Sequence, residues 1–180
     1  MRRQLRPFYS NTDLALVYCA PYSHRRWPDH ISRVAKTAEI LAGMAPESVA
    51  DLSCGDGEVV IQAGLRDIAT LGDLAPGWPY RGPIEQTIQA IPDVDVFVCS
   101  ETLEHVADPD GLLLAIRGKA RRLLLSTPIG EDHSLNPQHY WGWDVSDLEE
   151  MLETAGWAGV VEVYEPSPGA YYSYQIWRCT

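Results

Sequence analysis

Residues 49–58 constrain the fold of this chain more than any other segment. They read VADLSCGDGE: a short apolar strand ends at Asp51, a turn follows with Gly55 and Gly57, and a helix begins. Doubly wound α/β sheets use this succession to build a nucleotide pocket at the carboxyl end of the first strand. The glycines allow close backbone approach to a ligand and turn conformations that a Cβ would oppose. Asp73 closes the next apolar run about 20 residues along, where such sheets have a ribose-binding carboxylate.

The same turn argues against a dinucleotide. A dinucleotide fingerprint reads G-x-G-x-x-G and lays the pyrophosphate on the helix N-terminus. Here the residue three positions after Gly57 is Val60, so the third glycine is missing, and Asp56 and Glu58 would repel a diphosphate. An acidic turn favours a ligand with positive charge and no phosphate, such as S-adenosylmethionine, which carries a sulfonium, an ammonium and a ribose.

Further apolar runs predict the other strands of a buried sheet. Residues 94–99 form a near-continuous apolar run, which is typical of a central parallel strand covered on both faces. A second run, 122–128, is stopped by proline. Beyond it, Ser146 and Glu149 have the spacing of a capping box, and Gly156 can end the helix that they begin.

These pieces carry a resemblance to a known family. The turn resembles motif I of the class I methyltransferases, in which Ser53 replaces the usual first glycine. From Ser48 to Trp157 the order and spacing are similar to the small S-adenosylmethionine-dependent methyltransferases that include the ubiquinone-biosynthesis O-methyltransferases. The resemblance implies a single α/β, Rossmann-like domain with a mostly parallel seven-stranded sheet, an antiparallel last strand and helices on both faces. The alternative is a glycine-rich turn in some other α/β protein.

A chain of 180 residues suits one domain, and we expect it to span residues 1–180. Within it we expect an irregular lead rich in aromatic and basic residues (1–27, hereafter the lead), a helix at 28–44 and the Rossmann-like core at 48–180. Smaller predictions are a short helix at 58–65, a weak edge strand at 80–84 and a closing hairpin of strands at 160–164 and 171–177.

Charge and hydropathy bear on partners and location. The net charge of −11 disfavours a broad surface for binding duplex nucleic acid. Half of the 14 Lys and Arg residues nevertheless precede Thr37, which marks either an arm for an anionic partner or a solvated face. No apolar run is long enough to cross a bilayer, and no signal-peptide core follows the basic start. We expect a cytoplasmic protein with no membrane partner.

The resemblance also implies a cofactor site. Its positions in this chain are Asp51, Ser53, Gly55, Gly57, Asp73, Ile84, Glu85, Ser100 and Glu101. Asp73 would accept hydrogen bonds from the ribose hydroxyls, Ile84 would pack on adenine and Glu85 would accept from the adenine amino group. Ser100 and Glu101 would face the reactive methyl. Trp27 and His30 are expected either to close the methionine end or to be an ordinary aromatic and a surface histidine.

The Glu-x-x-Glu-His segment 101–105 suggests a metal. If the turn is helical, Glu101, Glu104 and His105 share a face, and His139 or His133 could add a second imidazole. These groups suit a divalent ion, and the arrangement resembles the metal site of the small-RNA 3′-terminal 2′-O-methyltransferases. A metal would lower the pKa of an acceptor hydroxyl. The alternative is a structural turn whose histidine bonds the backbone.

Methyl transfer is also feasible without metal, because positioning supplies much of the rate and a base need only take a proton. Candidate catalytic residues are His139, Glu101 and His105. The aromatic residues of 140–143 are either a wall for a planar substrate or core packing. We expect O-methylation of a small molecule; the alternatives are methylation of an RNA end or nucleotide, and a cofactor-binding scaffold without activity. The strand-end motifs of adenine-amino and cytosine-C5 methylation are absent from the sequence.

Overall fold

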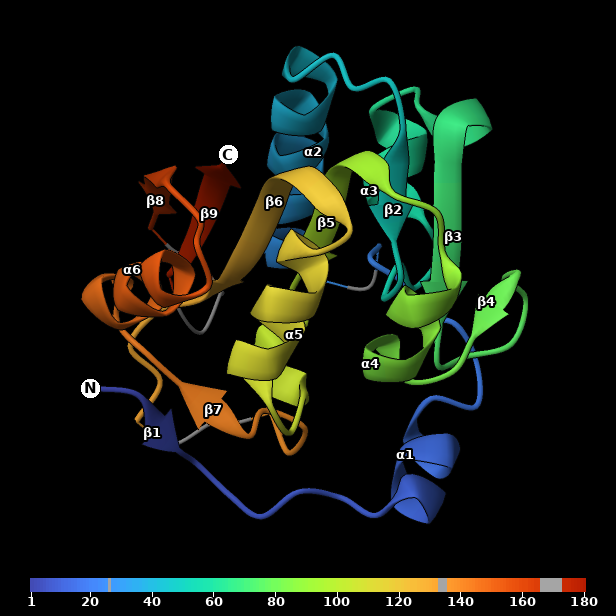
Figure 1. Cartoon of the computed structure of the whole chain (residues 1–180). Helices are drawn as coiled ribbons and strands as arrows, with labels where there is room; N and C mark the ends of the chain where they lie inside the picture. The colour runs from blue at the N-terminus through green and yellow to red at the C-terminus, as the bar shows by residue number, and fades with distance from the viewer. Residues whose placement is uncertain (26, 133–135, 166–172) are drawn as a thin grey trace.

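A seven-stranded sheet of order β4-β3-β2-β5-β6-β9-β8 forms the centre of the molecule (Figure 1). The computed structural model describes residues 1–25, 27–132, 136–165 and 173–180. In sheet order the strands are Tyr80–Arg81, Ala69–Asp73, Val49–Asp51, Val94–Ser100, Ala120–Pro128, Tyr174–Cys179 and Gly159–Tyr164. β9 runs antiparallel to both of its neighbours, and the pairings from β4 through β6 are parallel. The predicted mostly parallel sheet with an antiparallel last strand is confirmed.

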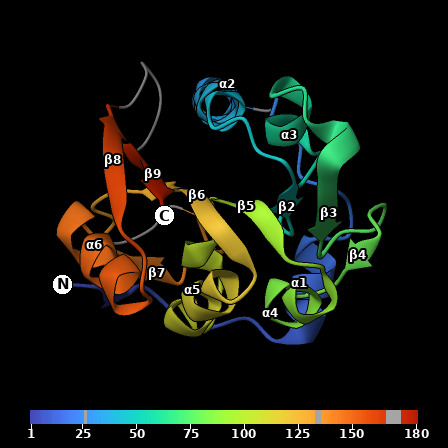
Figure 2. The same cartoon turned by 45° about the horizontal axis from the view of Figure 1, so that its top comes forward.

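Helices cover both faces of the sheet (Figure 2). α2 (Pro28–Gly43) and α3 (Glu58–Gln62) lie on one face; α4 (Ile84–Thr87), α5 (Pro109–Arg117) and α6 (Val145–Thr154) lie on the other. Because successive strand residues point to opposite faces, β5 supplies Val96 and Val98 to one hydrophobic core and Phe97 and Cys99 to the other. The apolar run of β5 is therefore buried on both sides.

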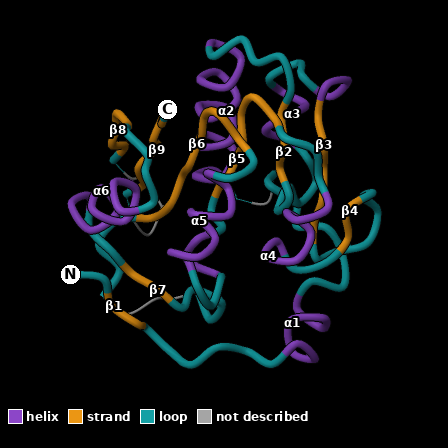
Figure 3. Tube along the Cα trace, viewed as in Figure 1, coloured by secondary structure: helices purple, strands orange, loops and turns teal. Residues whose placement is uncertain are grey.

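The lead crosses the carboxyl ends of the strands, at the lower edge in Figures 1 and 3. It is more ordered than predicted, because it contains β1 (Arg3–Gln4) and α1 (Asn11–Val17). β1 pairs antiparallel with β7 (Trp141–Gly142), and the backbone N–H of Leu5 donates to the carbonyl of Tyr140. A capping box between Ser10 and Asp13 begins α1. Backbone pairing thus holds the first residues against the loop before α6.

Several predicted boundaries are corrected. α3 ends at Gln62 rather than at residue 65, and Ile84 begins α4 instead of ending the edge strand β4. α6 is capped by Asp144 with Asp147 in a capping box, so the predicted cap at Ser146 is wrong. The loop of the predicted C-terminal hairpin lies largely outside the described residues. Among the helices that the structure describes, none has the length and apolar character needed to cross a membrane.

Candidate cofactor and active site

A cavity of about 460 Å³ opens at the carboxyl ends of β2, β3 and β5, beneath the lead. In doubly wound sheets this edge is where ligands bind. The strand ends and the loops that follow them contribute Ser53, Gly55, Asp73, Ser100 and Glu101 to the cavity wall. Of the predicted cofactor residues, only Asp51 and Gly57 lie outside this wall.

Asp73 is fixed by the glycine turn. Its Oδ2 accepts a hydrogen bond from the Gly55 N–H at 2.8 Å, and its Oδ1 accepts from the Ala75 N–H at 2.8 Å. Each carboxylate oxygen has a second lone pair, so both can still accept from a ligand hydroxyl. Gly57 lies in the same turn, immediately before α3, and has a left-handed backbone with φ +78. A Cβ at this position would lie 3.2 Å from the Trp78 ring.

Asp51 lies under the turn rather than in the cavity. Its Oδ1 accepts from the Ser53 N–H at 3.2 Å, and the Ser53 hydroxyl lies 2.7 Å from that of Thr102. Burial raises the pKa of Asp51 to about 7. Asp51 therefore acts on the cavity through the backbone of Ser53.

The acidic residues of the turn are paired with the lead. Asp56 accepts from the backbone N–H of His24 at 3.0 Å, and its other oxygen lies 2.6 Å from Nδ1 of the same histidine. Glu58 accepts from Arg25 at 2.6 Å. Neither carboxylate lines the cavity. Their role as attractors of a cationic ligand, inferred from the sequence, is corrected: they hold the lead in place.

Glu101 faces Arg33 of α2. It follows β5 with φ +49, and its Oε2 lies 3.3 Å from Nη1 of Arg33, whose side chain is 7% exposed. Its Oε1 accepts from the Ser126 hydroxyl at 3.2 Å. The condition that the segment be helical from Glu101 onward is not met, because the 3₁₀ turn covers only Leu103–His105. Glu101 therefore does not join the cluster that the sequence predicted for it.

Glu104, His105 and His139 do come together. One potential ligand atom of each lies within 4.8 Å of those of the other two, and the two imidazole centroids are 4.7 Å apart. Nδ1 of His105 donates to the carbonyl of Gln138 at 2.9 Å, and Nδ1 of His139 lies 2.8 Å from Oε2 of Glu131. Burial raises the pKa of Glu104 and lowers that of His105 to about 3. His133 lies outside the described residues.

The wall beside Asp73 has the residues expected around an adenine. Ile84 is 6% exposed, and both Ile84 and Glu85 line the cavity from the first turn of α4. Leu74 and Pro83 complete this apolar stretch. Ile84 and Glu85 thus line the same cavity as Asp73, while the roles of all three toward a cofactor stay a prediction.

Four aromatic side chains of the lead also line the cavity: Phe8, Tyr9, Tyr18 and Tyr22. Tyr140 joins them, and its ring makes an edge contact with Phe8 at 4.7 Å between centroids. Trp143 instead belongs to the core, where its indole N–H donates to Thr127. Of the two alternatives for the aromatic residues of 140–143, lining the cavity applies to Tyr140 and core packing applies to Trp143.

His30 lines the cavity, and its Nδ1 lies 2.9 Å from the Tyr22 hydroxyl. Trp27 is 46% exposed and does not line it. Of the two residues expected at the methionine end, the structure brings only the histidine to the cavity.

Comparison with solved structures identifies the architecture. The 1,6-didemethyltoxoflavin-N1-methyltransferase of Burkholderia thailandensis, with bound 1,6-didemethyltoxoflavin and S-adenosylhomocysteine, superposes with a TM-score of 0.67 over 97% of this chain and 91% of that one, at 18% identity. The chain has the class I methyltransferase fold. The magnesium protoporphyrin IX methyltransferase of Synechocystis PCC 6803, with bound S-adenosylhomocysteine, has a TM-score of 0.62 and 16% identity, covering 84% of both chains. No protein-family model and no curated protein matches the sequence.

Within this class I methyltransferase fold, sequence reasoning missed three residues: Arg33 and His24, which line the cavity, and Glu131, which holds the cavity-lining His139. Arg33 carried a weak signal, as a basic residue on the apolar face of a predicted helix. Glu131 carried none, because its pairing with His139 is made by a loop. His24 likewise gave no local sign that it would bond Asp56.

Proposed function

We propose that the protein transfers a methyl group from S-adenosylmethionine to a hydroxyl oxygen of a small, planar molecule. The observation that carries this proposal is that one cavity is lined by a fixed carboxylate at Asp73, by the apolar side chain of Ile84 and by a partly buried carboxylate at Glu101, which would meet the ribose, the adenine and the sulfonium, respectively. The bound S-adenosylhomocysteine in both structural neighbours supports the same cofactor.

The residues fit that cofactor chemically. The oxygens of Asp73 would accept from two ribose hydroxyls, because their backbone partners use only one lone pair each. Ile84 would pack on the adenine and Glu85 would accept from its amino group. Ser53 and Glu101 would hold the methionine end. When bound, the cofactor supplies a methyl group on a positively charged sulfur, and a nearby carboxylate stabilises that charge.

The cavity favours a small acceptor over an RNA end. Three of the basic residues that suggested an anionic partner are engaged within the described part of the chain: Arg2 with Asp110, Arg3 with Asp144 and Arg25 with Glu58. The aromatic wall offers stacking surface instead, which suits a flat ring system. The neighbours named above are methyltransferases of 1,6-didemethyltoxoflavin and of magnesium protoporphyrin IX, which agrees with this class.

The acceptor hydroxyl would lie against His139 and His105. Glu131 holds Nδ1 of His139, and a carboxylate in that position fixes the orientation and tautomer of an imidazole. His105 bonds a neutral carbonyl. In the absence of a bound cation, His139 is therefore the group that would take the hydroxyl proton.

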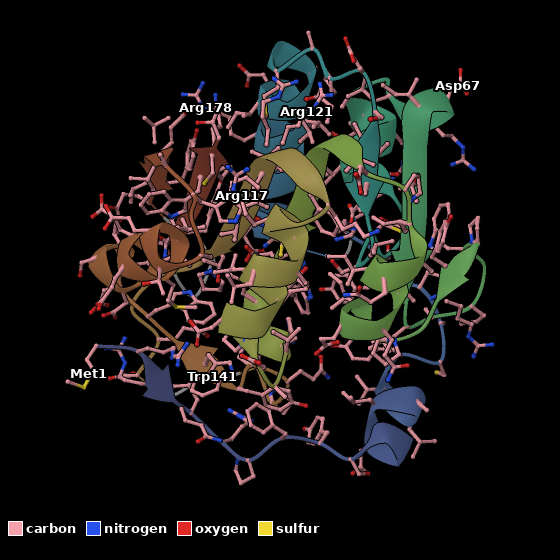
Figure 4. All side chains as sticks on the ribbon, in the orientation of Figure 1. Met1, Asp67, Arg117, Arg121, Trp141 and Arg178 are labelled. Carbon is pink, nitrogen blue, oxygen red and sulfur yellow. The ribbon has the colours of Figure 1, made fainter. Side chains whose placement is uncertain are left out.

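Calorimetry with S-adenosylhomocysteine tests the cofactor proposal. We expect one site per chain and at least ~10-fold weaker binding in Asp73→Asn, because a charge-assisted acceptor of two hydroxyls is lost. Asp67→Asn is the matched control, since Asp67 is exposed at the edge far from the lead (Figure 4). Absence of binding at millimolar ligand would refute the proposal.

A labelled methyl donor then tests the acceptor. We expect label to enter pooled hydroxylated aromatic compounds and not RNA oligonucleotides. Label in RNA alone would replace the small-molecule proposal with its RNA alternative. Cofactor binding without label in either pool would favour the scaffold.

A further inference from the structure

We propose that Glu104, His105 and His139, hereafter the metal triad, bind a divalent transition-metal ion at the acceptor end of the cavity. The binding itself stands on the geometry of these side chains. Only the role given to the ion rests on the proposed function.

The first observation is an unpaired buried oxygen. Glu104 is fully buried, and its Oε2 accepts from the Thr127 hydroxyl at 3.2 Å, whereas its Oε1 has no hydrogen-bond partner among the residues that the structure describes. Burying an unsatisfied carboxylate oxygen is costly. Nε2 of His105 lies 4.0 Å from this Oε1, beyond hydrogen-bond reach. A cation about 2.0–2.2 Å from each atom would satisfy both.

The second observation is how the two imidazoles are held. Metal-binding histidines usually donate their other ring N–H to a carbonyl or carboxylate, which fixes the ring and its tautomer. His105 donates from Nδ1 to the carbonyl of Gln138, and Nδ1 of His139 is held by the carboxylate of Glu131. In His105 this arrangement turns Nε2 toward Glu104. The supporting contacts of a metal site are thus already present.

The donor set determines the class of ion. Two imidazoles and one carboxylate suit Zn²⁺, Fe²⁺, Co²⁺ or Mn²⁺, whereas Mg²⁺ and Ca²⁺ prefer oxygen ligands alone. Three protein ligands leave a position open for water or substrate. His105 and His139 both line the cavity, so that position would face the acceptor. Glu101 is not a fourth ligand here, because it pairs with Arg33.

The role of the ion follows from its charge. An acceptor hydroxyl bound at the open position loses its proton to solvent more readily, because the cation stabilises the alkoxide or phenoxide. That oxygen then forms the new O–CH₃ bond while the S–CH₃ bond breaks and its electron pair stays on sulfur. Charge and atoms balance with one released proton and one thioether product.

Titration of the metal-free protein with Co²⁺ tests the site directly. We expect visible d–d absorption bands that saturate at one ion per chain and are displaced by Zn²⁺. Glu104→Gln keeps the side-chain volume and removes the charge, and should weaken binding by about 100-fold or more, since even an outer-shell partner is worth ~10–100-fold. His105→Gln, at a less buried position, is the second variant in case the first does not fold.

His30→Gln is the matched control, because it removes an imidazole from the same cavity but outside the triad. We expect its bands to be unchanged. A wild-type protein without bands, or bands that persist in both triad variants, would overturn the proposal. This test is independent of the cofactor test. S-adenosylhomocysteine binding without Co²⁺ bands would refute only the metal site. Co²⁺ bands without cofactor binding would refute only the proposed function.

Discussion

Asp51 is an acid whose charge the fold disfavours. Its carboxyl is 3% exposed and its burial raises the pKa from 3.8 to about 7. Below about pH 4 the folded and unfolded states both hold the proton. As the pH rises from there to about 7, the unfolded state releases it first, so the folded state loses up to about 4 kcal/mol. The fold tolerates this loss of stability at the end of β2, where the Asp51 side chain accepts a hydrogen bond from the Ser53 N–H of the turn.

Asp51→Asn should therefore raise the melting temperature of the ligand-free protein at pH 8 and leave it nearly unchanged at pH 4. The amide keeps an oxygen for the Ser53 N–H and cannot ionise. Thermal unfolding followed by circular dichroism at both pH values measures the difference. The exposed Asp67→Asn should show no such pH dependence; an equal effect of Asp51→Asn at both pH values would contradict the mechanism.

Alanine substitutions at Gly55 and Gly64 separate the effect of backbone strain from the effect of the contact between the glycine turn and the lead. Both have left-handed backbones, with φ +54 and +71, so alanine at either costs about 1–3 kcal/mol in strain. A Cβ at Gly55 would also lie 2.7 Å from the His24 ring and 3.0 Å from the Tyr22 carbonyl, whereas at Gly64 nothing lies within 4 Å. We expect both variants to lose stability, and only Gly55→Ala to weaken S-adenosylhomocysteine binding in calorimetry. If both variants bound S-adenosylhomocysteine equally well, the contact between the turn and the lead would not matter for binding.

At the scale of elements, the lead and the turn before α3 form one unit. Asp56→Ala removes two hydrogen bonds to His24 and should expose the lead to trypsin without lowering the stability of the sheet. Rates of limited proteolysis measure this. Glu39→Ala, which removes the exposed ion pair with Lys36 on α2, is the control and should leave the rate unchanged. A similar increase in both variants would mean that Asp56 does not hold the lead.

Local patterns predicted elements well and partners poorly. The apolar run of β5 and the glycine turn required only neighbouring residues, so both were predictable. Two capping boxes compete at α6, and the sequence does not separate them; Asp144 caps it because the Gly130 N–H bonds the Trp143 carbonyl and so fixes the chain just before it. The Arg33–Glu101 pair joins distant segments, and no periodicity encodes it.

At the scale of the whole molecule, basic groups of the lead form ion pairs with acidic residues of the remaining chain. The N-terminal amine pairs with Asp147 at 2.7 Å, and the lead makes further ion pairs with acidic residues of the core. Exposed pairs of this kind are weakened by salt, since the screening length falls from about 10 Å at 0.1 M to about 3 Å at 1 M. The basic lead therefore belongs to the fold, and its charge is used on the protein's own surface.

Hydrogen exchange at low and high salt checks this assignment. Amides of the lead should exchange faster in 1 M salt, while those of β5 and β6 stay protected, because apolar burial strengthens rather than weakens in many salts. Protection of the lead that is independent of salt would show that apolar contacts alone hold it.

The lead has a consequence for how such a protein diversifies. Its cavity-lining aromatics come from one continuous stretch, and that stretch is fastened at its two ends, by the pairing of β1 with β7 and by the contact of His24 with Asp56. These two fastening points are natural splice sites for a chimera. Under the proposed function, exchanging the segment between them is expected to change which acceptor the cavity encloses, while the strand ends proposed to hold the methyl donor stay the same.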